Sequence, residues 1–234
     1  MAKPPRPWIV TKHGPLQKLE NNLWVVDGQV PNLPFTRRMS IVKRGDGTLL
    51  FFNAIPLAEP ELGEVKAWGK PSSLVVPHDQ HMIDARPFAE KLELKVYAPK
   101  ACEEKARQRA VLAGTLEDVP ADPGIVIEAA GGVKSGEPVI VVTSENGHKS
   151  VLVSDILMNS RKEQMGLMPR LMGFAGSFKI VPIFRLMFLK DKQALKTHLN
   201  RLATLPGLTH FVPSHGDVAS ENVAQGIRSA AETL

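Results

Sequence analysis

Three short segments of the chain each place a histidine or an aspartate directly after a run of apolar, mostly β-branched residues. They are residues 76–81 (Val-Pro-His-Asp-Gln-His), 153–157 (Val-Ser-Asp-Ile-Leu) and 212–217 (Val-Pro-Ser-His-Gly-Asp). Such runs are typical of buried strands, and ligand-binding side chains collect at strand ends in layered α/β folds. Because imidazole and carboxylate groups bind zinc, iron and manganese, the three segments predict a site for one divalent metal ion.

The candidate metal ligands are His78, His81, Asp155 and His215. Three protein ligands and a water molecule are enough for a catalytic site. Such an ion lowers the pKa of its water from about 15.7 to roughly 7, which makes hydroxide available near neutral pH. Asp79, next to the first histidine, is the candidate catalytic base.

Each of these residues also has a structural alternative. His78 and Asp79 could cap a helix that follows them, since Asp is a favoured N-cap residue. Asp155 could bind backbone donors of its own loop, and His215 could form a hydrogen bond within a tight turn. A metal-free protein therefore remains an open alternative.

The expected elements fall into two halves. The first half begins with strands joined by an Asp-Gly turn and continues with alternating strands and helices, which predicts parallel strands. The expected elements of this half are strands 23–28, 37–43, 48–53, 74–76 and 95–98 and helices 61–68, 83–91 and 101–110. The second half contains strands 124–129, 137–144, 149–157 and 210–213 and helix 219–234. This order predicts an α/β protein with four αββα layers, in which two mixed sheets pack face to face with helices outside.

The order of elements resembles the metallo-β-lactamase superfamily, in particular a bacterial branch with a weakened metal motif. The first motif of the superfamily is a strand followed by His-x-His-x-Asp-His. His78 matches its first position, whereas Gln80, Met82 and Ile83 occupy the other ligand positions. The resemblance therefore implies a reduced metal site.

The later motifs of the superfamily match in part. Residues 129–136 (Ala-Ala-Gly-Gly-Val-Lys-Ser-Gly) lack the histidine of the glycine-rich loop, and they lack the spacing of a phosphate-binding loop, which favours a plain glycine turn. Asp155 matches the bridging aspartate at a strand end, and His215 matches the last histidine in its Pro-x-His-Gly context.

The resemblance implies a single domain over residues 1–234, with a basic, Met-rich helical insertion at about 160–203. It implies a metal-dependent hydrolase that uses one zinc, iron or manganese ion and its bound hydroxide. The missing ligand positions support a function of another class, a metal-free scaffold or ligand-binding protein that has lost hydrolase activity.

Residues 161–201 contain nine Lys or Arg and two acidic residues, a net charge of +7, against +5 for the whole chain. They hold four of the eight methionines, Met165, Met168, Met172 and Met187. Because insertions at this point often cover the active site in the superfamily, the resemblance implies a lid whose charge suits a small anionic substrate. Core-facing helices, a homodimer contact and, less favoured, a membrane-surface contact are the alternatives.

The composition argues against several other classes. With 1 Cys the chain has no intrachain disulfide, and its basic start is not followed by the apolar run of a secretory signal. There is no run of about 18 apolar residues, so we expect a cytoplasmic protein without a membrane span. No nucleic-acid motif is present. We expect Cys102 to pack rather than react, and His198, in a basic helix, to face water.

Overall fold

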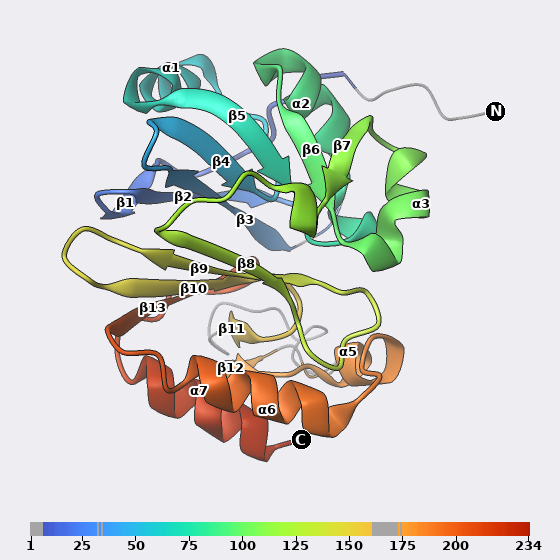
Figure 1. The fold of residues 1–234 in the computed structure, drawn as a ribbon. Coiled ribbons are helices and arrows are strands. Elements are labelled where there is room, and N and C mark those ends of the chain that lie inside the picture. The colour runs from blue at the N-terminus through green and yellow to red at the C-terminus, as the bar shows by residue number, and fades with distance from the viewer. Residues whose placement is uncertain (1–6, 32, 34, 161–172, 174) are drawn as a thin grey trace. The chain divides into compact units, whose positions relative to one another are not determined.

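The computed structural model describes residues 7–31, 33, 35–160, 173 and 175–234. The chain divides into two compact units, Met1–Ile125 (unit 1) and Val126–Leu234 (unit 2). Each unit has its own sheet, hydrophobic core and helices (Figure 1). The single domain over residues 1–234 remains a prediction.

Unit 1 is built on a seven-stranded sheet whose strands follow one another in chain order. Its strands are β1 (Gln17–Glu20), β2 (Leu23–Gln29), β3 (Thr36–Lys43), β4 (Thr48–Phe52), β5 (Lys70–Val75), β6 (Lys95–Ala98) and β7 (Leu112–Thr115). The first four strands pair antiparallel, and β4 to β7 pair parallel.

Helices provide the crossovers that parallel strands require. They are α1 (Glu59–Trp68), α2 (Ala85–Leu92) and α3 (Glu103–Arg107), with the short 3-10 helices η1 (Asp79–His81) and η2 (Lys100–Cys102). A third 3-10 helix, η3 (Leu116–Asp118), follows the last strand, β7. The core of unit 1 lies between the sheet and these helices. Phe51 of β4 meets Phe88 of α2 edge to face, with ring centroids 5.2 Å apart. Trp24 of β2 stacks on Trp68 at the end of α1.

Unit 2 has a four-stranded sheet in the order β13-β10-β9-β8. Its strands are β8 (Ile125–Ala129), β9 (Pro138–Thr143), β10 (Lys149–Val153) and β13 (Leu208–Pro213). The segment between β10 and β13 contains a small two-stranded sheet, β11 (Met158–Ser160) and β12 (Gly176–Lys179), followed by α5 (Pro182–Met187) and α6 (Lys192–Leu202). The last element is α7 (Val223–Glu232).

In unit 2, α6 and α7 cover one face of the four-stranded sheet (Figure 1). Val141 and Phe211 of the sheet share a core with Leu199 of α6 and Ile227 of α7. Strand β9 pairs antiparallel with β10, and β10 pairs parallel with β13. Both units therefore have the predicted plan, in which antiparallel strands come first and parallel strands follow.

Some elements were not predicted from the sequence. Strands β1, β7, β11 and β12 have three or four residues each, too few to give a clear alternation of apolar and polar side chains. Met165, Met168 and Met172 of the predicted lid lie outside the described residues, and Met187 ends α5. No helix in the described part of the chain has both the length and the apolar character needed to cross a membrane.

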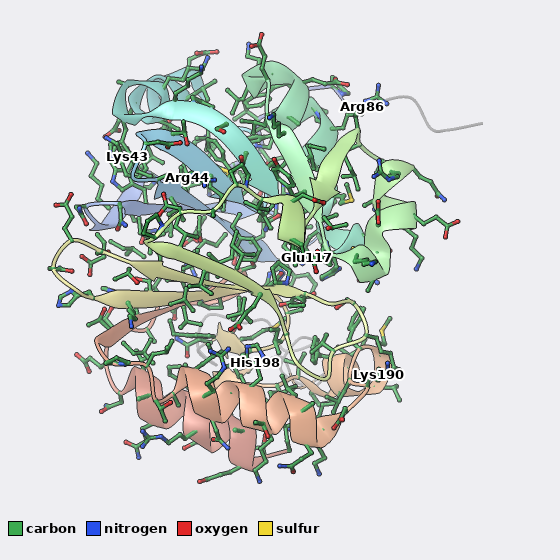
Figure 2. All side chains as sticks on the ribbon, viewed as in Figure 1. Lys43, Arg44, Arg86, Glu117, Lys190 and His198 are labelled. Carbon is green, nitrogen blue, oxygen red and sulfur yellow. The ribbon has the colours of Figure 1, made fainter. Side chains whose placement is uncertain are left out.

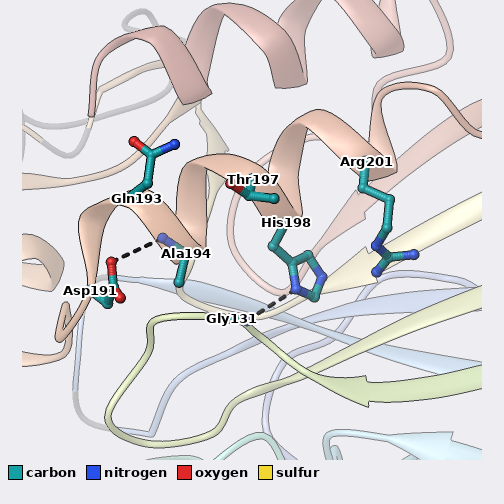
Figure 3. Close-up of a pocket in the computed structure, with 7 residues that line it drawn as sticks. All are labelled: Gly131, Asp191, Gln193, Ala194, Thr197, His198 and Arg201. Atoms are coloured by element: carbon teal, nitrogen blue, oxygen red, sulfur yellow. Dashed lines mark hydrogen bonds between the residues drawn. The ribbon is translucent and has the colours of Figure 1, made fainter.

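The prediction that His198 faces water is wrong. Only 9% of its side chain is exposed, and it lies between α6 and the loop that joins β8 to β9 (Figure 2). Its Nδ1 accepts a hydrogen bond of 3.0 Å from the Gly131 N–H, beside an open groove of about 470 Å³ (Figure 3). Burial on the inner face of an amphipathic helix outweighs the basic character of the helix as a whole.

The glycine turn before β9 is confirmed as a structural turn. The Gly132 carbonyl accepts hydrogen bonds from the N–H groups of Lys190 and Asp191, just before α6. Gly132 has a φ of +74°, and a Cβ there would lie 2.0 Å from the Asp191 carbonyl oxygen. Only glycine fits this close approach, so residues 131 and 132 hold the loop against the start of α6.

The burial of His198 predicts how the stability of the protein changes with pH. Burial lowers the pKa of His198, Glu128 opposes this effect and Arg201 adds to it. The unfolded chain binds a proton near pH 6.5 and the folded protein only at lower pH, so stability falls as the pH drops below about 6.5. We expect a smaller loss in His198→Asn, whose Oδ1 can accept the same N–H, as measured by urea unfolding at pH 7, 6 and 5. The matched control, exposed His148→Asn, should keep the wild-type pH dependence.

Candidate metal centre

Asp155 and His215 lie side by side because β10 pairs parallel with β13. The register pairs Val153 with Pro213, the last residues of the two strands. The Ser214 N–H donates to the Val153 carbonyl at 2.9 Å and continues the pairing. Asp155 and His215 are each two residues beyond that last pair, and His215 Nε2 lies 3.4 Å from Asp155 Oδ1. We call these two residues the Asp–His pair.

The separation within the Asp–His pair fits two ligands of one metal ion. A distance of 3.4 Å between Nε2 and Oδ1 is long for a hydrogen bond between these groups. Two ligand atoms at 2.0–2.1 Å from a tetrahedral zinc ion would be separated by about 3.3 Å. Both side chains are partly exposed, His215 by 19% and Asp155 by 17%. The donor set and its spacing are therefore compatible with a divalent ion.

The loop that carries His215 is fixed against β11. The Asp217 N–H donates to the Asn159 carbonyl at 2.6 Å, and Asn159 Nδ2 donates to the Asp217 carbonyl at 2.9 Å. Between His215 and Asp217, Gly216 has a φ of +92°, and a Cβ there would lie 2.1 Å from the Asn159 carbonyl oxygen. A glycine is therefore required next to the histidine for reasons of packing.

The loop that carries Asp155 is held by Glu137, which the sequence analysis did not identify. The Glu137 side chain is fully buried, and its Oε1 accepts hydrogen bonds from the N–H groups of Ser154, Asp155 and Ile156 at 2.9, 2.7 and 3.2 Å. The backbone donors of this loop are therefore bound by Glu137, a role that the structural alternative had assigned to Asp155. The available sequence signal was a single charged residue directly before an apolar strand.

Unit 1 contains a second group of candidate ligands, the histidine pair. His78 follows β5 by three residues and precedes η1, which contains His81. The His81 N–H donates to the His78 carbonyl at 3.1 Å. The two imidazole rings meet edge to face, with centroids 4.7 Å apart. Two imidazoles on one tetrahedral ion would have centroids roughly 5 Å apart, so this spacing is also compatible with metal binding.

The hydrogen bonding of His78 fits a metal ion less well. The Gln80 N–H donates to His78 Nδ1 at 3.3 Å, so this ring nitrogen is an acceptor in the structure. A histidine that binds metal through Nε2 normally donates a hydrogen bond from Nδ1, which is the opposite role. The helix-capping alternative for His78 is thus present in the structure.

Asp79 contacts basic residues in and just after α3. Its Oδ2 lies 3.7 Å from Lys105 Nζ, and its carbonyl accepts a hydrogen bond of 2.7 Å from Arg109. Burial, with a contribution from the Asp79 charge, raises the pKa of the Cys102 thiol to about 11. Cys102 is therefore protonated at neutral pH and packs in the core, as predicted. The assignment of Asp79 as a base stays a prediction.

A buried ion pair fixes the chain just after the histidine pair. Asp84 directly precedes α2, and its carboxylate accepts a hydrogen bond from the Arg37 guanidinium on β3. The Arg37 side chain is 3% exposed and the Asp84 side chain is 2% exposed. The ion pair therefore attaches the segment from His78 to Asp84 to the sheet of unit 1.

Several solved structures resemble this architecture. A structure of the DIM-1 metallo-β-lactamase exposed to ceftazidime is 15% identical, with a TM-score of 0.65, over 96% of this chain and 99% of that chain. The mono-zinc form of the metallo-β-lactamase FIM-1 from Pseudomonas aeruginosa is 14% identical, with a TM-score of 0.62, over 97% and 98%. A metallo-β-lactamase from Hirschia baltica is 14% identical, with a TM-score of 0.61, over 93% and 98%. No protein-family model matches the chain, and no curated protein matches its sequence.

At these identities the likeness shows the fold alone. The chain has the metallo-β-lactamase fold, and the fold class predicted from the sequence is confirmed. The match extends over nearly the whole length of both chains.

The Arg37–Asp84 pair predicts a large loss of stability on removal of one partner. Asp84→Asn would leave the Arg37 charge buried without its counter-charge, so we expect the free energy of unfolding to fall by about 3–5 kcal/mol in urea denaturation. The control is Glu90→Gln, which removes the charge of Glu90 in its exposed ion pair with Arg86 on α2; Arg86 is labelled in Figure 2. It should change stability by less than about 0.5 kcal/mol. A loss of under about 1 kcal/mol for Asp84→Asn would contradict a structural role of the pair.

Proposed function

We propose that this protein is a metal-dependent hydrolase with a reduced site that binds one divalent ion. The ligands are His78, His81, Asp155 and His215, and zinc, iron and manganese are the candidate metals. The observation that carries the proposal is the Asp–His pair, whose 3.4 Å separation fits two ligands of one ion. The metallo-β-lactamase fold and the match of Asp155 and His215 to metal positions of that superfamily support it.

Each residue has a defined role in this proposal. When bound, the ion would acidify a water molecule and polarise the bond to be hydrolysed. Asp155 supplies a negative charge and His215 a neutral imidazole, and both are held at strand ends. His81 supplies the imidazole from η1. Asp79 is the proposed base, which would accept a proton at its carboxylate.

The substrate is proposed to be a small anionic molecule. The support is the basic segment between β10 and β13, in which Lys179, Lys190, Lys192 and Lys196 belong to the described residues. Arg201 and Arg185 in the same segment already bind Glu128 and Thr233. A cytoplasmic location, a homodimer and the absence of nucleic-acid and membrane partners stay predictions.

A metal-free scaffold or ligand-binding protein is the second candidate function. The hydrogen bond from Gln80 to His78 Nδ1 favours it, because it occupies a ligand nitrogen with a proton donor. Gln80, Met82 and Ile83 at the other positions of the first motif also favour it. On this alternative, replacement of Asp155 or His215 affects stability alone.

Metal analysis separates the two functions. We expect about one ion per chain in wild-type protein grown with zinc, iron and manganese, measured by inductively coupled plasma mass spectrometry, and almost none in Asp155→Ala. The control His148→Ala removes an exposed histidine and should leave the metal content unchanged. Zinc at 100 times its Kd should stabilise wild-type protein by about 2.7 kcal/mol. Absence of metal and of stabilisation would favour the metal-free scaffold.

The variant His78→Asn tests whether His78 binds metal or only caps η1. Asn Oδ1 can accept the Gln80 N–H in place of Nδ1, and Asn is a favoured N-cap residue, so stability should change by less than about 1 kcal/mol. If His78 is a ligand, the zinc Kd should rise at least tenfold. An unchanged Kd would reduce the site to His81, Asp155 and His215.

The role of Asp79 can be tested with a panel of phosphoester, lactone and thioester substrates. A general base contributes about 10²–10⁴ in rate, so Asp79→Asn should lose activity by such a factor while its metal content stays at the wild-type level. Lys105→Gln changes the neighbour of Asp79 without removing the carboxylate and should retain most of the activity. Full activity in Asp79→Asn would exclude it as the base.

A further inference from the structure

The Glu137 carboxylate is an unusual feature of unit 2. It is fully buried, and a single oxygen accepts hydrogen bonds from three successive backbone N–H groups, those of residues 154, 155 and 156. Its own backbone is fixed as well, since the Glu137 carbonyl accepts a hydrogen bond of 2.8 Å from the Ala130 N–H, and Pro138 begins β9 directly after it. The carboxylate therefore projects from a rigid position.

Three consecutive N–H groups can converge on one oxygen only where the backbone curls around it. Such a concave run of N–H groups binds anions well, and charge-assisted hydrogen bonds of this kind are stronger than neutral ones. The central residue of the run is Asp155, whose N–H makes the shortest of the three bonds, 2.7 Å. The bonds thus fix the backbone of Asp155 and with it the direction in which its side chain leaves the chain.

A buried carboxylate is a costly group with which to hold the loop after β10. Its desolvation costs several kcal/mol, and many natural loops are closed with neutral side chains or backbone groups alone. Here its three hydrogen bonds converge on the loop whose central residue, Asp155, is a candidate metal ligand.

We infer that Glu137 is a positioning residue for Asp155, because its hydrogen bonds to residues 154–156 hold the candidate metal ligand in its binding orientation. This inference rests on the proposed metal site. Glu137 acts through the loop and is not itself assigned as a ligand. Its removal should therefore affect metal affinity more than it affects the fold of unit 2.

The test compares two variants of Glu137 with a matched core variant. Glu137→Gln keeps an acceptor oxygen and removes the charge, and Glu137→Ala removes both. Leu199→Ala creates a cavity in the core of the same unit, at a side chain that is 1% exposed. All are made in the full chain, and circular dichroism confirms that each is folded at the temperature used. If Glu137→Ala fails to fold, Glu137→Gln is the variant that decides.

Two quantities are measured. In metal-free protein, NMR hydrogen exchange at residues 154–156 should become at least tenfold faster in Glu137→Ala, while exchange in β9 changes less. In a chelator-competition titration with zinc, the Kd should rise at least tenfold in Glu137→Gln and further in Glu137→Ala. Leu199→Ala should be less stable than wild-type protein, but its zinc Kd should stay within about twofold.

The outcomes separate this inference from the proposed function. Wild-type protein that binds zinc, with the same Kd in both Glu137 variants, would overturn the positioning role alone. Equal losses of affinity in Glu137→Gln and Leu199→Ala would also overturn it, because general destabilisation would then explain the effect. Wild-type protein that binds no zinc, iron or manganese would reject the metal site and the inference with it.

Discussion

The parallel pairing of β10 with β13 is the constraint on which the candidate site of unit 2 depends. It joins strands that are far apart in the sequence and ends both at the pair Val153–Pro213. Because each strand continues for two residues before its functional side chain, a shift of register would separate Asp155 from His215. The crossover with α5 and α6 and the core that these helices form with the sheet stabilise that register. The packing of the unit is thus a condition of the 3.4 Å separation.

Buried charge recurs beside both groups of candidate ligands. Glu137 binds the loop of Asp155, and the Arg37–Asp84 pair fixes the segment that follows His81. Each needs a complete set of partners, since an uncompensated buried charge costs several kcal/mol. Neither the extensive apolar core nor the regular strands require these charges, and they lie where loops must be held in one conformation.

The sequence predicted features whose signals are local and missed those that depend on distant partners. Asp155 and His215 were found because each directly follows an apolar strand. Glu137 was missed because its partners lie 17 to 19 residues along the chain, and the Arg37–Asp84 pair spans 47 residues. His198 was assigned to the surface because the basic composition of its helix was weighed above its position beside buried Leu195 and Leu199. The antiparallel-then-parallel order, by contrast, followed from turn residues and element spacing.

Gly216 and His215 are adjacent, but a steric constraint acts on the glycine and a proposed chemical role on the histidine. Any side chain at position 216 would collide with the Asn159 carbonyl, so only glycine is compatible with this fold at that position. The His215 side chain is partly exposed, by 19%, and under the proposed function it is kept for metal binding. In a comparison of descendants of this chain, an unchanged glycine would report only that the loop survives. Under the proposed function, the histidine beside it would report whether the metal site had been kept.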